Sequence, residues 1–271
     1  MSESGAAQAA EWRFRDGRLA PGQAALAVEV PVALEYNGIA HAVMLATPGD
    51  LEDFALGFSL SEGILDRAAD LYGVESSTSP AGITLALDIA TGAFARLKER
   101  RRSLVGRTGC GICGTESLDQ VLRPLAALTA PAWRLPAASL ARASAALAGA
   151  QPLQRQTGAT HGAAWCTPDG AITHLREDVG RHNALDKLIG ALVKAGVERE
   201  QGFALITSRA SVEMVQKAAT AGISILAAVS GPTTLAVQTA RQLGVTLIGF
   251  ARGANFSVYT HRHRLAEAGE D

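Results

Sequence analysis

Three short apolar runs alternate with two amphipathic helical stretches near the end of the chain, and this alternation limits the fold more than any other feature. The apolar runs are Phe203–Thr207, Ile223–Val229 and Thr246–Phe250, and the helical stretches are Val212–Ala221 and Thr233–Leu243. Continuous apolar strands separated by helices are typical of parallel strands joined by right-handed crossovers. The sequence therefore predicts an α/β fold with helices flanking a sheet.

The segments just before this pattern extend the same lobe. His161–Cys166 and Ala171–Arg176 alternate as strands around a Pro-Asp-Gly turn, and a helix with an apolar stripe is expected over Arg181–Ala195. The Ala-rich stretch Pro131–Gln156 is expected to be helical and to connect two lobes. We therefore expect a C-terminal α/β lobe over residues 131–271.

The first part of the chain favours strands. Val28–Glu35 and Ile39–Ala46 flank Asn37-Gly38, a dipeptide that supplies the positive φ angles of a type I′ hairpin turn. A helix is expected from Asp50 and a strand over Ile83–Ile89. These elements predict a smaller, strand-rich N-terminal lobe over residues 23–130. Residues 1–22 are expected to form a disordered tail, because the chain begins with small and polar residues.

Charge and hydropathy exclude several classes of protein. A formal net charge of -1 gives no overall attraction to nucleic acid or to an anionic membrane. No apolar run approaches the roughly 20 residues that a membrane-spanning helix needs, and the N-terminus lacks the basic and apolar regions of a secretory signal. The sequence thus predicts a cytoplasmic protein without nucleic-acid or membrane partners.

Two of the three cysteines form the motif Gly109-Cys110-Gly111-Ile112-Cys113-Gly114. The glycines leave both sulfur atoms unhindered, and Arg107 and a preceding basic cluster favour the reactive thiolate. The cluster consists of Arg96, Lys98, Arg100, Arg101 and Arg102. An odd number of cysteines also argues against a disulfide scaffold. We therefore expect thiol chemistry or metal binding at this motif.

Four interpretations of Cys110 and Cys113 remain open from the residues alone. The pair could relay sulfane sulfur, act as a redox couple, bind zinc or be structural. Zinc needs two further ligands, and the candidates are His161 and Cys166, with no second closely spaced pair. Cys166 lies in an expected strand among Ala and Trp and is better explained as a small buried hydrophobe.

A second polar cluster spans Glu177-Asp178-Val179-Gly180-Arg181-His182-Asn183-Ala184-Leu185-Asp186-Lys187. It lies where a strand leads into a helix, at the carboxyl edge of the expected sheet, and open α/β folds bind ligands at such an edge. A capped helix with a salt-bridged first turn explains Asp178, Asp186 and Lys187 well but explains His182 and Asn183 poorly. The cluster is therefore a candidate functional site with a structural alternative.

The ends of the last three strands also carry polar residues. Thr207-Ser208-Arg209 and Ser230-Gly231-Pro232-Thr233-Thr234 precede helices, with Ser230 or Gly231 as the expected cap of the second. The last strand ends in Phe250-Ala251-Arg252-Gly253-Ala254-Asn255, where Arg252 suits a bidentate phosphate contact. These residues predict a pocket for a nucleotide or phosphorylated cofactor. Neither the P-loop nor the Rossmann glycine pattern is present.

Six motifs together resemble the formate dehydrogenase accessory sulfurtransferase family (FdhD/NarQ). They are G-C-G-I-C-G, T-H-G-A-A-W, E-D-V-G-R-H-N-A-L-D-K, T-S-R, S-G-P-T-T and G-F-A-R-G. The resemblance covers nearly the whole chain from Val28 onward and is most specific in the motif from Glu177 to Lys187. It implies that the two lobes form one family domain.

The resemblance implies a function that the residues alone do not reach. It implies that Cys110 accepts a persulfide sulfur from a cysteine desulfurase, with Cys113 as the accessory thiol. The sulfur then goes to a molybdenum bis(molybdopterin guanine dinucleotide) cofactor required for formate dehydrogenase. Phe250, Ala251, Arg252, Gly253, Ala254 and Asn255 match the cofactor-binding stretch, and the partners implied are the desulfurase, the dehydrogenase and a second copy in a homodimer. No permanently bound metal is expected.

The fold implied is a mixed sheet with helices on both faces, similar to that of cytidine deaminases, but deamination is not expected. A deaminase needs H-x-E before a P-C-x-x-C motif, whereas here the cysteine pair comes first and His161-Gly162-Ala163 lacks the glutamate. Two alternative functions remain. One is a cofactor-binding chaperone whose thiols are incidental, and the other is a zinc-dependent hydrolase that uses Cys110, Cys113 and His161.

Overall fold

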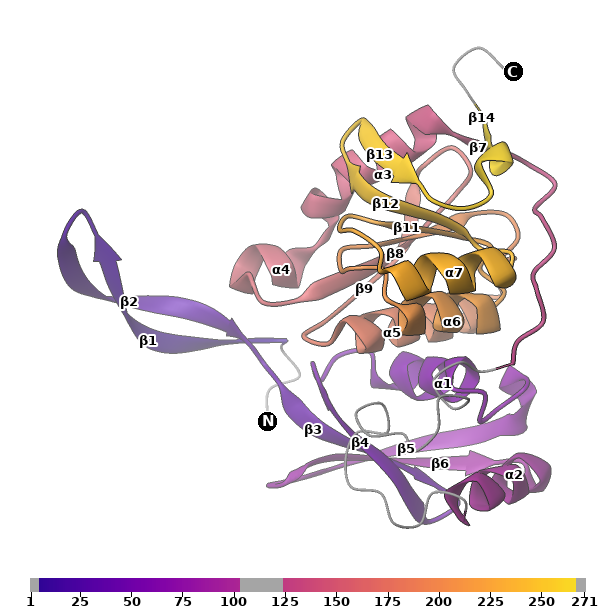
Figure 1. Ribbon diagram of the computed structural model, residues 1–271. Coiled ribbons are helices and arrows are strands. Elements are labelled where there is room, and N and C mark those ends of the chain that lie inside the picture. The colour runs from indigo at the N-terminus through magenta and orange to yellow at the C-terminus, as the bar shows by residue number, and fades with distance from the viewer. Residues whose placement is uncertain (1–4, 103–123, 267–271) are drawn as a thin grey trace.

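Two sheets and the helices between them form the body of the protein. The computed structural model describes residues 5–102 and 124–266 (Figure 1). We call the elements between Val30 and Arg102 the first lobe and those between Leu135 and Ala266 the second lobe. The predicted boundary between the lobes falls within residues 124–134, which contain neither helix nor strand.

The first lobe is a four-stranded sheet covered on one face by a helix. Its strands lie in the order β4-β3-β6-β5, and α1 (Leu51–Ser61) packs on the face that also buries Ala93 and Leu97 of α2 (Thr91–Arg102). The predicted turn at Asn37-Gly38 is confirmed, with φ angles of 47° and 78°. The strands are β3 (Val30–Tyr36), β4 (Ile39–Ala46), β5 (Leu71–Ser79) and β6 (Gly82–Ile89), of which β5 was not predicted.

The start of the chain forms a long hairpin, which we call the arm. It pairs β1 (Ala6–Arg15) with β2 (Arg18–Ala27) in antiparallel register. The prediction that residues 1–22 form a disordered tail is therefore wrong for the residues that the structure describes. The physical reason is the turn Asp16-Gly17, where φ angles of 50° and 78° give the same turn geometry as Asn37-Gly38.

The second lobe is a six-stranded mixed sheet with helices on both faces. Its order is β13-β12-β11-β10-β8-β9, and β10, β11 and β12 are parallel to one another. The predicted β-α-β-α-β unit and the α/β fold with a mixed sheet flanked by helices are thus confirmed. The strands are β8 (His161–Cys166), β9 (Ile172–Asp178), β10 (Phe203–Ile206), β11 (Ile225–Ala228), β12 (Thr246–Arg252) and β13 (Asn255–Val258).

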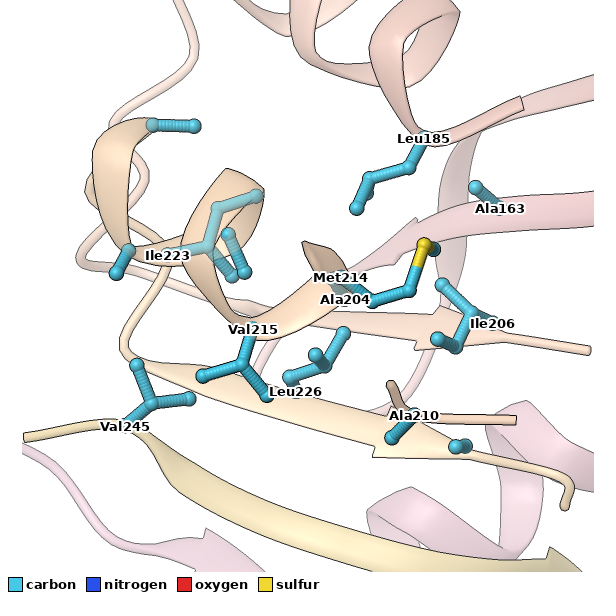
Figure 2. Close-up of a cluster of buried hydrophobic side chains, with 14 of the residues drawn as sticks. Ala163, Leu185, Ala204, Ile206, Ala210, Met214, Val215, Ile223, Leu226 and Val245 are labelled. Carbon is cyan, nitrogen blue, oxygen red and sulfur yellow. The ribbon is translucent and has the colours of Figure 1, made fainter. Parts of the chain in front are cut away.

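The helices of the second lobe divide between the two faces of its sheet. On one face, side chains of α5, α6 and α7 pack against alternate residues of the strands, as the buried cluster in Figure 2 shows. On the other face, α3 contributes Leu140, Ala143 and Leu147 to a second buried cluster. The helices are α3 (Ala137–Ala150), α4 (Pro152–Thr157), α5 (Arg181–Lys194), α6 (Val212–Thr220) and α7 (Thr234–Gln242).

Smaller elements complete the described chain. The Ala-rich stretch that was expected to be helical contains α3 and α4. A short parallel pair joins β7 (Leu135–Pro136) to β14 (Leu265–Ala266), which brings the two ends of the second lobe together. None of the helices in residues 5–102 and 124–266 is long and apolar enough to cross a membrane. The cytidine-deaminase likeness implied by the sequence stays a prediction.

Helices α1 and α5 join the two lobes through a glycine contact. A Cβ atom added to Gly57 of α1 would lie 1.7 Å from the backbone oxygen of Asp186, and one added to Gly190 of α5 would lie 2.0 Å from that of Asp53. The two backbones therefore touch, as at other helix crossings that place small residues at the point of closest approach. This contact fixes one lobe against the other.

Gly57→Ala is expected to destabilise the protein by about 3 kcal/mol, because the methyl group must push two backbones apart. Gly149→Ala in α3 is the matched control, since an added Cβ there meets no atom within 4 Å. That control is expected to raise stability by roughly 0.5–1 kcal/mol, through the better helix propensity of Ala. Urea denaturation of the two variants measures both values, and equal midpoints would contradict the glycine contact.

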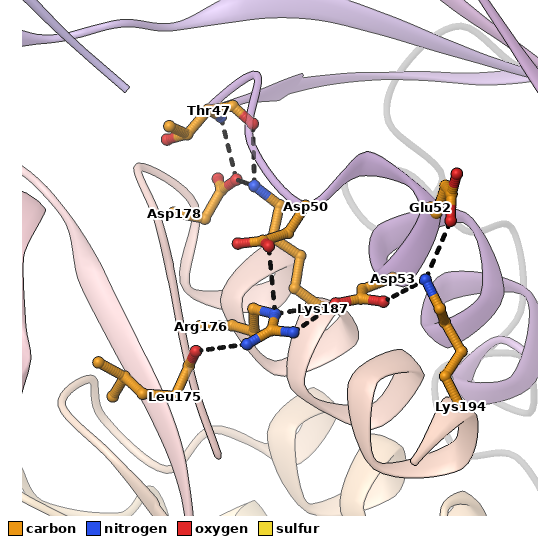
Figure 3. A network of polar contacts seen from close by, with 9 residues as sticks. All are labelled: Thr47, Asp50, Glu52, Asp53, Leu175, Arg176, Asp178, Lys187 and Lys194. Atoms are coloured by element: carbon orange, nitrogen blue, oxygen red, sulfur yellow. Dashed lines mark hydrogen bonds and ion pairs between the residues drawn. The ribbon is translucent and has the colours of Figure 1, made fainter. Parts of the chain in front are cut away.

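A buried ion pair fastens the end of β4 to the start of α5. Lys187 Nζ lies 2.7 Å from Asp178 Oδ2, and both side chains are fully buried. The backbone carbonyl of Thr47 accepts a hydrogen bond from Lys187 Nζ at 2.9 Å. The backbone N–H of Thr47 donates a hydrogen bond to Asp178 Oδ2 at 3.0 Å (Figure 3). Asn183 adds a bond to the Leu45 carbonyl. Each buried charge thus has several partners, as buried ion pairs require.

A second buried pair lies on the other side of the α1–α5 crossing. Lys217 of α6 is within 2.9 Å of both carboxylate oxygens of Asp186 and within 2.6 Å of Glu62. Ser61 Oγ donates to Asp186 at 2.5 Å. Side chains from α1, α5 and α6 therefore meet in one polar network, and polar bonds reinforce the glycine contact from both sides.

Candidate functional site

Four strands end at one edge of the six-stranded sheet. β10, β11 and β12 are parallel, and β9 runs in the same direction because it is antiparallel to β8, which is itself antiparallel to β10. Their carboxyl ends therefore lie at the same edge. The polar segments that the sequence places after these strands are brought together there, where open α/β sheets bind ligands.

Phe250 and Arg252 occupy this edge at the end of β12. Phe250 has a φ angle of 55°, a left-handed conformation that is strained for a bulky residue. Its ring lies against Gly231, where an added Cβ would come within 2.7 Å of the ring, and 49% of the residue is exposed. Arg252 Nε donates to the Val229 carbonyl at 3.1 Å. An exposed aromatic face and a cation thus lie next to the loop after β11.

The other residues of the predicted cofactor stretch have different positions. Ala251 is 1% exposed, and its side chain packs into the core beneath α3. Ser144 Oγ donates to the Ala251 carbonyl at 2.9 Å and accepts from the Gly253 N–H at 3.1 Å. Gly253 and Ala254 form the turn into β13, which begins at Asn255. The stretch is therefore a hairpin whose outer side chains, not Ala251, are accessible.

The loops after β10 and β11 carry the helix caps. α6 begins after Ser211, and α7 begins after Thr233, whose hydroxyl accepts from the Ala236 N–H at 3.2 Å. The expectation that Ser230 or Gly231 caps the second helix is wrong. The Ser230 carbonyl instead accepts from the Phe250 N–H at 3.2 Å, so this part of the loop is bound to β12.

A polar pocket of about 420 Å³ opens beside β8 and β10 at the same edge. Its walls come from Gln151 and Gln154 at the start of α4, from residues 158–160, and from His161 and Thr207. Partial burial and the nearby positive charge of Arg181 lower the pKa of His161 below its usual range. A neutral imidazole and a hydroxyl therefore line the pocket. The volume lies within the range of small-molecule sites.

Most polar side chains of the Glu177–Lys187 cluster have structural roles, and Arg181 and His182 are the exceptions. Glu177 is buried and accepts from the N–H groups of Leu153 and Gln154 at 2.9 and 2.8 Å, which caps α4. The buried residues Asp178, Asn183, Asp186 and Lys187 belong to the networks between the lobes. These five side chains hold the fold together, as the structural alternative predicted for Asp178, Asp186 and Lys187.

Arg181 and His182 are the side chains of this cluster that no structural network explains. Arg181 Nε and His182 Nε2 are buried and have no hydrogen-bond partner within the described part of the chain. Burial and the charges of Arg181 and Lys217 lower the pKa of His182 to about 4, against the smaller opposite effects of Glu213 and Glu62. The imidazole is therefore neutral near pH 7. These two residues remain functional candidates.

The pH dependence of stability should report the burial of His182. Because its folded pKa of about 4 lies below the usual 6.5, its contribution to stability is complete above pH 6.5 and is lost as the pH falls toward 4. His182→Gln is expected to remove up to about 3 kcal/mol of that decline. Urea denaturation of both proteins at several pH values between 4 and 7 measures the difference, and parallel curves would contradict it.

The cysteines fall into two groups. Cys110 and Cys113 lie outside the described residues. Cys166 is fully buried in β8, and burial raises the pKa of its thiol to about 12, so the prediction of a small buried hydrophobe is confirmed. It lies at the opposite end of β8 from His161, roughly 17 Å away along an extended strand. The two therefore cannot complete one zinc site with the cysteine pair.

Comparison with known proteins decides the family of this chain. The model of the FdhD/NarQ family matches residues 27–266, which is most of the sequence. The chain belongs to the FdhD/NarQ family. The resemblance inferred from the six motifs is therefore confirmed, and the FdhD/NarQ match begins at the residue where the arm ends.

Two named relatives and one crystal structure match this chain over most of its length. A protein of Variovorax paradoxus named sulfur carrier protein FdhD is 60% identical over 89% of this chain and 86% of its own. A protein of the same name from Cupriavidus necator is 56% identical over 93% of this chain and 88% of its own. A crystal structure from Desulfotalea psychrophila, assigned as a formate dehydrogenase accessory protein, has a TM-score of 0.73 at 24% identity. It covers 96% of this chain and 99% of its own. At that identity the structure supports the fold alone.

Proposed function

We propose that this chain is a sulfur carrier that matures the cofactor of formate dehydrogenase in the cytoplasm. The observation that carries the proposal is the name shared by relatives of up to 60% identity over most of the chain, sulfur carrier protein FdhD. In this proposal Cys110 accepts a sulfur atom from the persulfide of a cysteine desulfurase. The recipient is the molybdenum of a bis(molybdopterin guanine dinucleotide) cofactor, and the carrier works as a homodimer.

The two thiols of the motif account for all bonds and electrons in the proposed transfer. The Cys110 thiolate attacks the terminal sulfur of the donor persulfide, the donor S–S bond breaks, and the donor cysteine leaves as a thiolate. Attack by Cys113 on the inner sulfur of the Cys110 persulfide then releases hydrosulfide and leaves a Cys110–Cys113 disulfide. The two electrons on the released sulfide come from the two thiols. A cellular thiol reductant must then reduce the disulfide.

The basic residues before the motif support this role. Those from Arg96 to Arg102 lie between the middle and the end of α2, where Arg96 pairs with Asp66 at 2.7 Å and Lys98 lies over the ring of Phe94. Nearby cations lower the pKa of a thiol and attract an acidic partner surface. In the sequence the cysteine motif begins seven residues after this basic helix, and a cation close to the thiol favours the persulfide anion.

The carboxyl edge of the second sheet is the proposed site for the recipient. Phe250 offers an exposed ring on which a guanine or pterin can stack, and Arg252 offers a cation for phosphate. The pocket beside His161 and Thr207 adds hydrogen-bonding groups for the rest of the ligand. The edge therefore offers the three kinds of contact that a dinucleotide cofactor needs.

Intact-mass measurement tests the central step. The purified protein is incubated with a cysteine desulfurase and cysteine and is then weighed with and without a thiol reductant. The expected result is a gain of one sulfur atom that the reductant removes and that peptide mapping places on Cys110. No gain of mass, or a gain that maps to Cys166 instead, would refute the proposed carrier.

Phe250→Ala is expected to weaken the binding of guanosine diphosphate by about 10-fold to 100-fold, the effect of losing one stacked aromatic side chain. Tyr72→Ala is the matched control, because Tyr72 is also an exposed aromatic residue but lies on β5 of the first lobe. Isothermal titration calorimetry measures both. If the two variants bind the nucleotide equally well, the cofactor edge is wrongly placed.

A further inference from the structure

The arm has one apolar face and one charged face. Paired residues of neighbouring strands share a face, so the pairs Trp12–Pro21 and Phe14–Leu19 lie together on one side. Trp12, Phe14 and Leu19 are 72%, 68% and 64% exposed. The opposite side carries the charged residues Glu11, Arg13, Arg15 and Arg18. The outer half of the arm therefore exposes an amphipathic ribbon with its apolar face uncovered.

Most of the arm is left uncovered by the other residues that the structure describes. Its base packs against α4, and Figure 1 shows the remainder extending away from both sheets. An isolated two-stranded ribbon is marginally stable in water, and a cluster of large exposed apolar side chains marks an interaction site. The apolar face of the arm is therefore a surface on which a partner can dock.

A second uncovered apolar surface lies on the first lobe. Val32 and Leu34 of β3 are buried toward α1, so Pro31 and Ala33 face the other way. Val43 pairs with Ala33 and Leu45 pairs with Pro31, so these four residues form one apolar patch on the outer face of the sheet. Val43 is 64% exposed and Leu45 is 56% exposed. We call these four residues the outer patch.

We propose that the arm of one protomer docks its Trp12–Phe14–Leu19 face on the outer patch of a second copy of this chain. Both halves of the contact are present on every copy, and the arm extends away from both sheets of its own protomer (Figure 1). A two-fold pair uses both halves of both copies, as closed homodimers do. The charged face of each arm stays in water.

The size of this contact fits a stable dimer. Trp12 and Phe14 together expose about 300 Å² of side-chain surface, given the area of aromatic side chains. Each docked arm buries a similar area of the outer patch. A dimer with two-fold symmetry contains this arm–patch contact twice. The total is about 1,200 Å², the lower end of the range for specific interfaces.

This docking rests on the homodimer of the proposed function and names the contact that holds the two copies together. The part of the arm that makes the contact lies outside the residues that the family model matches. The FdhD/NarQ match begins at residue 27, so the arm precedes it. Sedimentation velocity on the full chain is the test. The variants are Trp12→Glu with Phe14→Glu on the arm, Leu45→Glu on the outer patch, and Arg13→Ser with Arg15→Ser on the charged face as the matched control.

The expected result is a dimer for the original protein and the control, and a monomer for the arm and patch variants. A dimer in every variant would overturn the arm contact and leave the homodimer standing. A monomeric original protein would overturn both. Far-ultraviolet circular dichroism identifies any variant that fails to fold.

Photocrosslinking gives a readout that needs no disruptive variant. A benzoylphenylalanine in place of Phe14 is activated in a mixture of ¹⁴N- and ¹⁵N-labelled protein. A crosslink between light and heavy chains that maps to β4 supports the docking. Crosslinks confined to one chain, to another element or to a copurifying protein would overturn it.

Discussion

Cys110→Ala is expected to abolish sulfur transfer and with it the activation of formate dehydrogenase. The loss should be on the order of a thousand-fold or more, because the variant lacks the nucleophile that forms the persulfide. Binding of guanosine diphosphate should be unchanged, since the proposed cofactor edge lies at the ends of β11 and β12. Formate dehydrogenase activity in cells that depend on this chain, measured beside nucleotide affinity, checks both parts.

Cys166→Ala is the matched control for this experiment. Its thiol is buried and its pKa is raised, so it forms no thiolate near pH 7, and removing it should leave sulfur transfer intact. Normal activation by Cys110→Ala would favour the alternative of a cofactor-binding chaperone with incidental thiols. Cys113→Ala separates the two steps, because it should still accept sulfur but release it slowly.

Lys187→Met is expected to destabilise the protein by about 3–5 kcal/mol, which is a large part of the stability of an ordinary domain. The substitution leaves the Asp178 carboxylate buried without its cation. Lys194→Met is the matched control in the same helix, since Lys194 pairs with Glu52 and Asp53 while 46% exposed. That change should cost less than about 1 kcal/mol. Urea denaturation of both variants measures the difference.

A double variant shows whether the loss arises from the unpaired charge. Adding Asp178→Asn to Lys187→Met removes both charges and should recover part of the lost stability, because the buried carboxylate is no longer present. Additive losses would instead mean that the hydrogen bonds of Asp178 to Thr47 and Asn183 dominate. The comparison therefore assigns the role of the ion pair independently of any activity measurement.

Much of the second lobe was predictable because its signals are local. The apolar runs at Phe203, Ile223 and Thr246 became the parallel strands β10, β11 and β12, and the stripe of α5 was read from helical spacing. The carboxyl edge followed from the strand directions. The cap of α7 was misplaced because a Ser and a Thr both precede that helix, and the bond from Phe250 to Ser230 decides between them.

The arm was missed although its turn signal is in the sequence. Asp16-Gly17 is as strong a hairpin signal as Asn37-Gly38, and Trp12, Phe14 and Leu19 alternate around it. The small residues at the start of the chain and its polar composition outweighed that signal. β5 was missed for a different reason, since Leu71 and Val74 are the only apolar residues of that strand that pack toward the core.

The roles of Asp178, Asp186 and Lys187 could not be predicted from one segment. Their partners Thr47 and Ser61 lie more than a hundred residues earlier, on the first lobe. A motif dense in charge is compatible with catalysis or with a buried ion pair until such distant partners are known. The structure supplies them, and it leaves Arg181 and His182 as the candidates that packing does not explain.

The contact between Gly57 and Gly190 limits how a protein of this design can move. Hinge closure is a common way to bring two reacting groups together, and it needs an interface that can open at low energy. Here two helix backbones touch, with buried charges on either side, so separating the lobes would resemble global unfolding. The two lobes therefore form one rigid body. Any movement that controls sulfur transfer has to occur in segments attached to this body or in the bound partner proteins.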